Sequence, residues 1–225
     1  MKPLRTLESV ETQEGTLSLK MRDTHDFLIT VGGRVLMTST AHRSEVALGA
    51  VACKRLATFA SPRVLVGGLG MGFTLRAVLD RLPKGAKVVV AELNPVVEQW
   101  CRGPLAHLTE KAVEDPRVTV AIEDVTKSMT RAANSGIETK FDAIVIDLYV
   151  GPDAGTQKQD PLYGAKAVDT ARRALKSGGI FAIWGEAFDP SFARRLEKVG
   201  FTVQHEKPGK GGLKHVIYIA QRAGS

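Results

Sequence analysis

The sequence has little of what marks a secreted, membrane-embedded or metal-binding protein. Among its 225 residues there are two cysteines, Cys53 and Cys101, far apart and in helix-like stretches. Neither has neighbours at metal-ligand spacing, so we expect reduced, buried or half-buried thiols and no metal site. No apolar run approaches the length of a membrane span, and the N-terminus lacks the apolar core of a signal peptide. We therefore expect a cytoplasmic protein with no membrane-spanning segment.

Aromatic residues are also scarce, at 6% of the chain, and they do not alternate with basic residues in a stripe. The net charge is +7, but the basic residues are dispersed, and only the segment 207–214 is a local cluster. We interpret that segment as an exposed loop; the alternative is a basic lip that meets an anionic substrate. The charge permits an acidic partner, but the missing stripe disfavours nucleic-acid binding.

The most informative segment is 64–72, where a β-branched apolar run ends in four glycines within six positions. A helix-like stretch follows, and a second apolar run, 87–92, ends in Glu92. This order is the layout of a nucleoside pocket at the carboxyl edge of a parallel sheet. Glycines allow positive φ and a close ligand approach, and a carboxylate can accept both hydrogen bonds of a ribose diol. We expect the cofactor to lie against Gly68, Gly70, Gly72 and Glu92.

Hydrophobic patterning predicts two parts in the chain. Residues 6–40 alternate as strands, with a hairpin turn at Gly32-Gly33, and so predict a small antiparallel meander. Ser44 is then expected to cap a helix over 45–56. Later strands and helices alternate, with strands at 64–67, 87–92, 117–122, 141–147 and 180–184, and helices at 72–82, 94–100, 125–134, 164–175 and 190–199.

The last two expected strands, 201–206 and 215–220, are joined by a segment too short for a crossover helix and must be antiparallel. The predicted fold class is therefore α/β: a doubly wound, Rossmann-like sheet with a terminal antiparallel hairpin, preceded by an N-terminal β meander. We expect the meander to form residues 1–42 and a nucleoside-binding domain to form 43–225.

The spacing Gly68-x-Gly70-x-Gly72, the turn 175–179 and the terminal hairpin resemble the class I S-adenosylmethionine-dependent methyltransferase fold. Within that fold, the chain resembles the spermidine synthase group over nearly its whole length. The likeness is carried by the N-terminal meander and by residues 64–76, 91–95, 123–125, 141–147, 151–154 and 161–163.

The resemblance implies a pocket for S-adenosylmethionine or its decarboxylated form. Glu92 would hold the ribose, Asp124 would face the adenine amino group, and Asp147 would lie beside the sulfonium and the acceptor. The neighbouring Leu93 and Val125 complete the expected cofactor-binding residues. The resemblance, together with the need to cover sheet edges, also predicts a homodimer formed through the meander.

The sequence departs from the group's pattern on the acceptor side. The group has a second aspartate shortly after the one that ends the strand, whereas this chain continues Asp147-Leu148-Tyr149-Val150-Gly151-Pro152. The acidic residues of the group near the first helix are replaced by His42 and Arg43. A polyamine site needs several carboxylates to offset the lost hydration of its ammonium groups. These departures predict an acceptor other than a polyamine.

We therefore predict methyl transfer from S-adenosylmethionine to a small-molecule acceptor. Asp147 would position the acceptor and act as base, Tyr149 would orient the acceptor, and His42 would be a further base. Each has a plain structural alternative: a strand-end cap for Asp147, packing for Tyr149, and a surface or core position for His42. Two other functions stay open, namely aminopropyl transfer from decarboxylated S-adenosylmethionine and nucleoside binding without catalysis.

Overall fold

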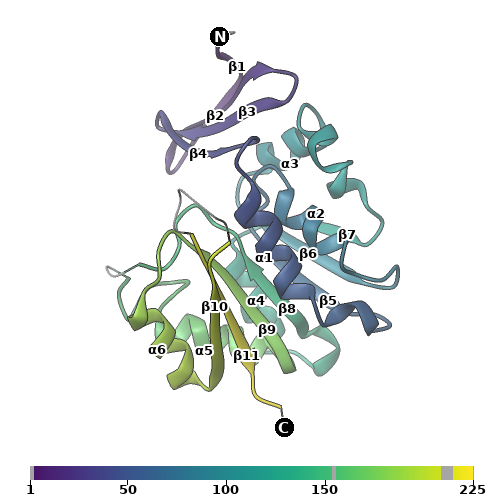
Figure 1. The fold of residues 1–225 in the computed structure, drawn as a ribbon, viewed down its shortest axis with the longest axis vertical. Helices are drawn as coiled ribbons and strands as arrows, with labels where there is room; N and C mark the ends of the chain where they lie inside the picture. Colours follow the sequence, from purple (N-terminus) through teal and green to yellow (C-terminus); the bar gives the residue numbers. More distant parts are fainter. Residues whose placement is uncertain (1–2, 154–155, 209–214, 225) are drawn as a thin grey trace.

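A computed structural model describes residues 3–153, 156–208 and 215–224. The described strands form two sheets (Figure 1), one with four strands in the order β1-β2-β3-β4 and one with seven in the order β10-β11-β9-β8-β5-β6-β7. The four-stranded sheet lies beyond one end of the larger sheet. Most of the basic segment expected to form a loop, 209–214, lies outside the described residues.

The N-terminal sheet is antiparallel throughout and consists of β1 (Arg5–Thr12), β2 (Gly15–Asp23), β3 (Asp26–Val31) and β4 (Arg34–Thr38). Gly32 and Gly33 form the expected hairpin turn with φ values of +52° and +82°, which glycine adopts without a steric cost. Strand β1 is an exposed edge. The homodimer expected from this sheet stays a prediction.

Two hydrogen bonds between distant residues attach the N-terminal sheet to the rest of the chain. The indole Nε1 of Trp100 donates to Oε2 of Glu8 at 2.7 Å. The imidazole Nε2 of His107 lies 2.8 Å from the carbonyl oxygen of Thr24. Apolar side chains of β2 and β3, among them Leu19 and Phe27, also belong to the main hydrophobic core. The sheet is therefore packed against the larger domain.

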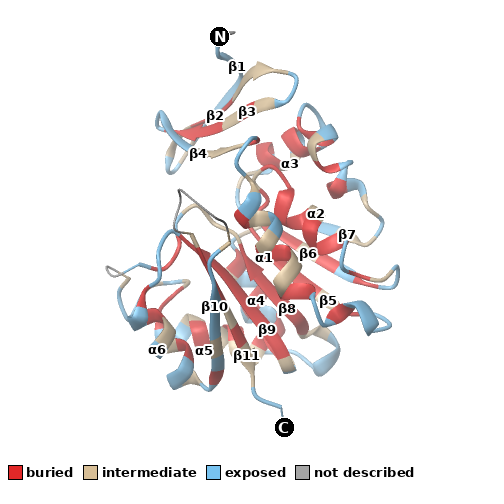
Figure 2. Ribbon diagram, in the orientation of Figure 1, coloured by how far each residue is buried: buried red, intermediate tan, exposed pale blue. Residues whose placement is uncertain are grey.

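The seven-stranded sheet confirms the predicted fold class. Its parallel part comprises β5 (Arg63–Gly67), β6 (Lys87–Glu92), β7 (Val118–Ile122), β8 (Phe141–Ile146) and β9 (Leu175–Gly185). Strands β10 (Phe201–Glu206) and β11 (Val216–Arg222) form the terminal antiparallel hairpin, and β11 pairs with β9. The central strands are buried along their length (Figure 2), as expected where helices cover both faces.

The helices are α1 (Arg43–Cys53), α2 (Phe73–Leu79), α3 (Pro95–Arg102), α4 (Val125–Ala133), α5 (Ala165–Ala174) and α6 (Pro190–Val199). Short 3₁₀ turns occur at Leu56–Thr58, Ala106–Thr109, Ala112–Glu114 and Ile137–Thr139. Val64 and Val66 of β5 belong to the buried cluster that includes α1 to α3, and Leu65 to the one that includes α4 to α6. This alternation places the two sets of helices on opposite faces. No helix in the described ranges is long and apolar enough to cross a membrane.

Two expected starts are wrong, and helices α1 and α2 each end three residues before the expected 56 and 82. Helix α1 begins at Arg43, with His42 at the capping position, so Ser44 lies inside the first turn, where its hydroxyl bonds Glu45. The expected turn 175–179 belongs to β9, which begins directly at Leu175. The pairing of β8 with β9 shifts register there, and this bulge absorbs the glycines.

Candidate active site

A cavity of about 450 Å³ lies at the carboxyl ends of β5, β6 and β8, between the two sheets. Its walls include Leu17, Ile29, Leu36 and Met37 from the N-terminal sheet and the loops that follow the parallel strands. The carboxyl edge of a parallel sheet is where ligands bind in such folds. This cavity is therefore the candidate active site.

The glycine turn forms one wall of the cavity. Gly68 has φ of +90°, and a Cβ there would collide with the carbonyl oxygen of Asp147. Gly70 has φ of +52°, and a Cβ would lie 2.7 Å from Sδ of Met37. Gly72, also at positive φ, is at the capping position of α2 and is not among the residues that line the cavity. Two of the three expected glycines therefore face the cavity, and the third starts the helix.

Glu92 is held in one orientation by backbone donors. Its Oε2 accepts from the N–H of Leu69 at 2.9 Å and its Oε1 from that of Asn94 at 2.8 Å. Burial raises the pKa of the carboxyl, and the N–H groups of Asn94, Leu69 and Leu93 oppose the rise. Glu92 and the expected neighbour Leu93 both line the cavity. The carboxylate is thus fixed between the glycine turn and the start of α3.

The segment after β7 contributes Asp124 and Val125, both of which line the cavity as expected. The Oδ1 of Asp124 accepts from the N–H and the hydroxyl of Thr126, each at 2.7 Å, and caps α4. The preceding Glu123 is paired with Arg131, which lowers its pKa to about 2. Asp124 therefore has a capping role in addition to its place in the wall.

Asp147 follows β8 directly and lines the cavity. Its Oδ2 accepts from the Thr74 hydroxyl at 2.6 Å. Burial, and after it the Glu45 carboxylate, raise the pKa of Asp147 to about 7, although the Thr74 hydrogen bond opposes the rise. A carboxyl that titrates near neutral pH can accept a proton from a substrate and release it again, as general-base catalysis requires.

Tyr149 connects the loop after β8 with the N-terminal sheet. The guanidinium carbon of Arg34 lies 5.6 Å from the centre of its ring, a cation–π arrangement. Burial raises the pKa of the phenol, and the Glu14 carboxylate raises it further. Tyr149 and Glu14 both line the cavity, so the N-terminal sheet contributes directly to the site.

The structure places His42 outside the set of residues that line the cavity. Its Nδ1 lies 2.8 Å from the carbonyl oxygen of Ser39, and its ring stacks on Phe73 with 4.0 Å between ring centres. His42 thus packs on Phe73 at the start of α2, and its role as a base stays a prediction.

Sequence reasoning predicted Glu92, Asp124 and Asp147 in the site but missed how many further acidic residues join them. Among the described residues, every Asp, Glu, Lys, Arg or His side chain that lines the cavity is acidic, although the chain carries a net charge of +7. These residues are Glu14, Glu45, Glu92, Glu123, Asp124, Asp147 and Asp160. Glu14 lies in the turn between β1 and β2, far from the expected motifs, whereas Glu45 lies in α1, two residues after Arg43. The inference that the acceptor side had lost its acids is wrong.

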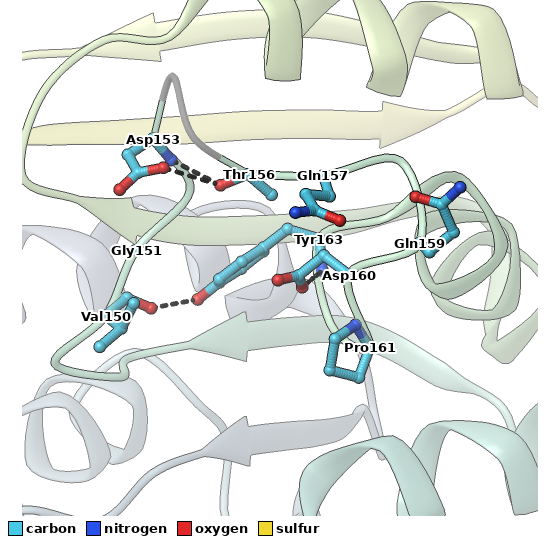
Figure 3. A pocket seen from close by; sticks show the side chains of 9 residues that line it. All are labelled: Val150, Gly151, Asp153, Thr156, Gln157, Gln159, Asp160, Pro161 and Tyr163. Atoms are coloured by element: carbon cyan, nitrogen blue, oxygen red, sulfur yellow. Dashed lines mark hydrogen bonds between the residues drawn. The ribbon is translucent and has the colours of Figure 1, made fainter.

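A second cavity of about 430 Å³ adjoins the first beside residues 150–153 and 156–163 (Figure 3). The two share Val150, Asp160, Pro161 and Tyr163. The Tyr163 hydroxyl donates to the carbonyl oxygen of Val150 at 2.9 Å across the loop. The remaining lining is largely polar, with Thr156, Gln157 and Gln159. The acidic cavity is thus continuous with a second cavity that polar side chains line.

These features define a Rossmann-like α/β protein with an acidic pocket at the carboxyl edge of its sheet, partly closed by an N-terminal antiparallel sheet. More than half of the chain, residues 52–190, matches the family model "Spermine/spermidine synthase domain". The chain belongs to that family, as its resemblance to the spermidine synthase group predicted.

Curated relatives in this family are polyamine aminopropyltransferases. The one from Mycobacterium tuberculosis (strain H37Rv) is 33% identical over 120 residues, which are 53% of this chain and 22% of the relative. The one from Pyrobaculum arsenaticum is 32% identical over 126 residues, 56% of this chain and 42% of the relative. The chain thus matches less than half the length of either relative.

Two solved structures share the fold, a spermidine synthase from Thermotoga maritima and a spermidine synthase in complex with the transition-state analogue AdoDATO. Each superimposes with a TM-score of 0.69 at 20% sequence identity. The superposition covers 96% of this chain and 72% of the spermidine synthase chain. The named relatives correct the predicted methyl transfer: the family assignment favours the alternative, aminopropyl transfer.

Proposed function

We propose that this protein transfers the aminopropyl group of decarboxylated S-adenosylmethionine to an amine acceptor. The observation that supports this most strongly is the exclusively acidic set of charged side chains in the described cavity wall. The decarboxylated donor carries a sulfonium and an ammonium group and no carboxylate. Carboxylates offset the desolvation of such cations, which is otherwise costly.

The same wall discriminates between the two possible donors. The carboxylate of S-adenosylmethionine itself would be brought among Glu14, Glu45 and Asp147. Like charges at short distance in a partly buried site repel strongly. No lysine or arginine among the described lining residues could pair with that carboxylate. The pocket therefore favours the donor that lacks it.

In the proposed reaction, the acceptor nitrogen attacks the carbon next to the sulfonium. The N–C bond forms as the C–S bond breaks, and the electron pair stays on sulfur, which leaves as neutral methylthioadenosine. The nitrogen loses one proton, and Asp147 is the residue that accepts it. Glu92 would hold the ribose and Asp124 the adenine edge, so the donor is oriented for an in-line displacement.

Tyr149 and Glu14 would bind the amine acceptor. The amine acceptor would lie on the side of Asp147 that faces the N-terminal sheet, within reach of Glu14. Tyr149, fixed by Arg34, would present its hydroxyl to the same space. The acceptor is thus a small amine, with polar room toward Gln157 and Gln159 for a longer chain.

The decisive experiment is a steady-state assay that measures methylthioadenosine release from decarboxylated S-adenosylmethionine with putrescine, spermidine and monoamines as acceptors. We expect release that depends on both substrates and is lost in Asp147→Asn. Glu197→Gln, which alters an exposed glutamate of α6, is the matched control and should behave as the parent. Turnover of S-adenosylmethionine with no release of methylthioadenosine would contradict the proposal.

A further inference from the structure

A chain of three polar side chains ends on one of the cavity's acids. The Ser44 hydroxyl donates to Oε2 of Glu45 at 2.7 Å, and its oxygen lies 3.1 Å from Nδ1 of His215. A hydroxyl has one hydrogen, and here Glu45 receives it. The serine oxygen therefore accepts from the imidazole, which carries its proton on Nδ1 in this arrangement. Both hydrogen bonds run toward the carboxylate.

This chain is assembled from parts of the sequence that are far apart. Ser44 and Glu45 are in the first turn of α1, and His215 lies 171 positions beyond Ser44, directly before β11. Ser44 is only 6% exposed. The His215 ring packs edge-on against Trp184, with 4.9 Å between ring centres, and Trp184 lines the cavity. The terminal hairpin thus positions the His215 imidazole against Ser44, which in turn bonds Glu45 in the cavity wall.

Glu45 and Asp147 are in different surroundings within one wall. Oε2 of Glu45 is occupied by the donor chain, whereas Oδ2 of Asp147 accepts from Thr74. The two carboxylates are close enough that the Glu45 charge raises the pKa of Asp147. An ammonium group has three N–H donors and can bond both carboxylates at once. When it loses a proton to one of them, the other still offsets the positive charge that develops on nitrogen.

We propose that Glu45 binds the reacting amine of the acceptor, and that Ser44 and His215 are positioning residues that hold its carboxylate beside Asp147. This inference rests on the proposed aminopropyl transfer and adds the acceptor-binding residue to it. Asp147 takes the proton, and Glu45 keeps its negative charge through the reaction. Hydrogen bonds to a charged group are worth more than neutral ones, so loss of the supporting donors weakens acceptor binding measurably.

The test compares variants by the KM for putrescine, by kcat, and by the affinity for methylthioadenosine measured by calorimetry. Glu45→Gln is expected to raise the KM for putrescine by about 10-fold or more. Affinity for the neutral nucleoside should stay within about 2-fold of the parent, which also shows that the variant is folded. Glu197→Gln is again the control.

The positioning residues are tested by rescue. Ser44→Ala and His215→Ala should each raise the KM for putrescine by about 3- to 10-fold. His215→Asn should recover most of that loss, because its amide N–H can replace the Nδ1–H donor. An unchanged KM in Glu45→Gln, or equal loss in His215→Asn and His215→Ala, would overturn the inference while the proposed function stands. A parent protein that releases no methylthioadenosine would overturn both.

Discussion

The Thr74 hydroxyl lies 2.6 Å from Oδ2 of Asp147, although the two residues are 73 positions apart. Thr74 is in the first turn of α2, directly after the glycine turn, and Asp147 follows β8. The contact therefore ties the part of the site expected to hold the nucleoside to the residue proposed as base. It also holds Oδ2 of Asp147 in place, and Asp147 lines the cavity.

Asp147→Asn should reduce turnover by about 10²- to 10⁴-fold, the range typical for loss of a general base. In the parent, kcat/KM should rise with pH and level off above about pH 7, because the pKa of Asp147 is raised to about 7 and only its ionised form accepts a proton. A pH–rate profile with methylthioadenosine release as the readout checks both. A flat profile in the parent across this range would contradict the assignment.

The same group should make folding stability depend on pH. Its pKa is higher in the folded protein than the ordinary value of 3.8, so the folded state binds the proton more tightly. The resulting stabilisation is complete below the ordinary pKa and is lost as pH rises through about 7. Asp147→Asn should therefore melt about 2–6 °C above the parent at pH 8. Calorimetry at pH 5 and pH 8 measures the difference, which should be smaller at the lower pH.

Gly68→Ala should destabilise the protein far more than Gly33→Ala, which changes the hairpin turn between β3 and β4. Both positions have positive φ, which costs an alanine about 1–2 kcal/mol. Only at Gly68 does a Cβ also collide with the backbone of Asp147; at Gly33 it meets nothing within 4 Å. For Gly68→Ala we expect a loss of about 2–5 kcal/mol of unfolding free energy and weaker nucleoside binding. For Gly33→Ala we expect only the cost of the positive φ, about 1–2 kcal/mol. Equal effects in denaturant titrations would argue against the close approach.

Glu14→Gln should lower the pKa of Tyr149, because burial and the Glu14 carboxylate together raise it in the parent. The chain has three tyrosines, and an ultraviolet pH titration follows their ionisation. Tyr149→Phe identifies which transition belongs to this residue. A titration curve that Glu14→Gln leaves unchanged would mean that the turn between β1 and β2 does not approach the phenol in solution.

Both cysteines should be unreactive in the native protein. Burial raises the pKa of Cys53 and of Cys101 to about 12, so very little thiolate exists at pH 8. Cys101 also donates to the carbonyl oxygen of Gly70 at 3.3 Å. A thiol-specific disulfide reagent should modify neither residue within the time in which it modifies both after unfolding. Rapid labelling of the folded protein would contradict this.

Local sequence pattern was sufficient for the fold and for the side of the pocket expected to hold the nucleoside. The glycine turn, Glu92 and Asp147 each follow a strand that its own composition identifies, and parallel strands bring such ends to one edge. The two wrong boundaries, at Ser44 and at Leu175, arose where a helix start and a bulge depend on neighbouring elements.

The acceptor side could not be predicted in the same way. Glu14 comes from a hairpin turn and His215 directly precedes the last strand, and no local motif marks either of them. Glu45 lies beside His42 and Arg43, in a segment that predicted the loss of acids. Only the packing of the N-terminal sheet brings Glu14 to the cavity, and only the packing of the terminal hairpin brings His215 to Ser44. The missing second aspartate after Asp147 therefore misled the functional prediction, because acids from elsewhere in the chain line the same space.

The distribution of these acids between two sheets has a thermodynamic consequence. Glu14 lies in the N-terminal sheet and Glu92 in the larger domain, and the Glu14 charge raises the pKa of Glu92, so like charges face each other across the cavity. A doubly charged ligand between them would act as a removable crosslink. By mass action, each substrate would then strengthen the docking of the sheet that encloses it, and conversion of the donor to neutral methylthioadenosine would loosen it.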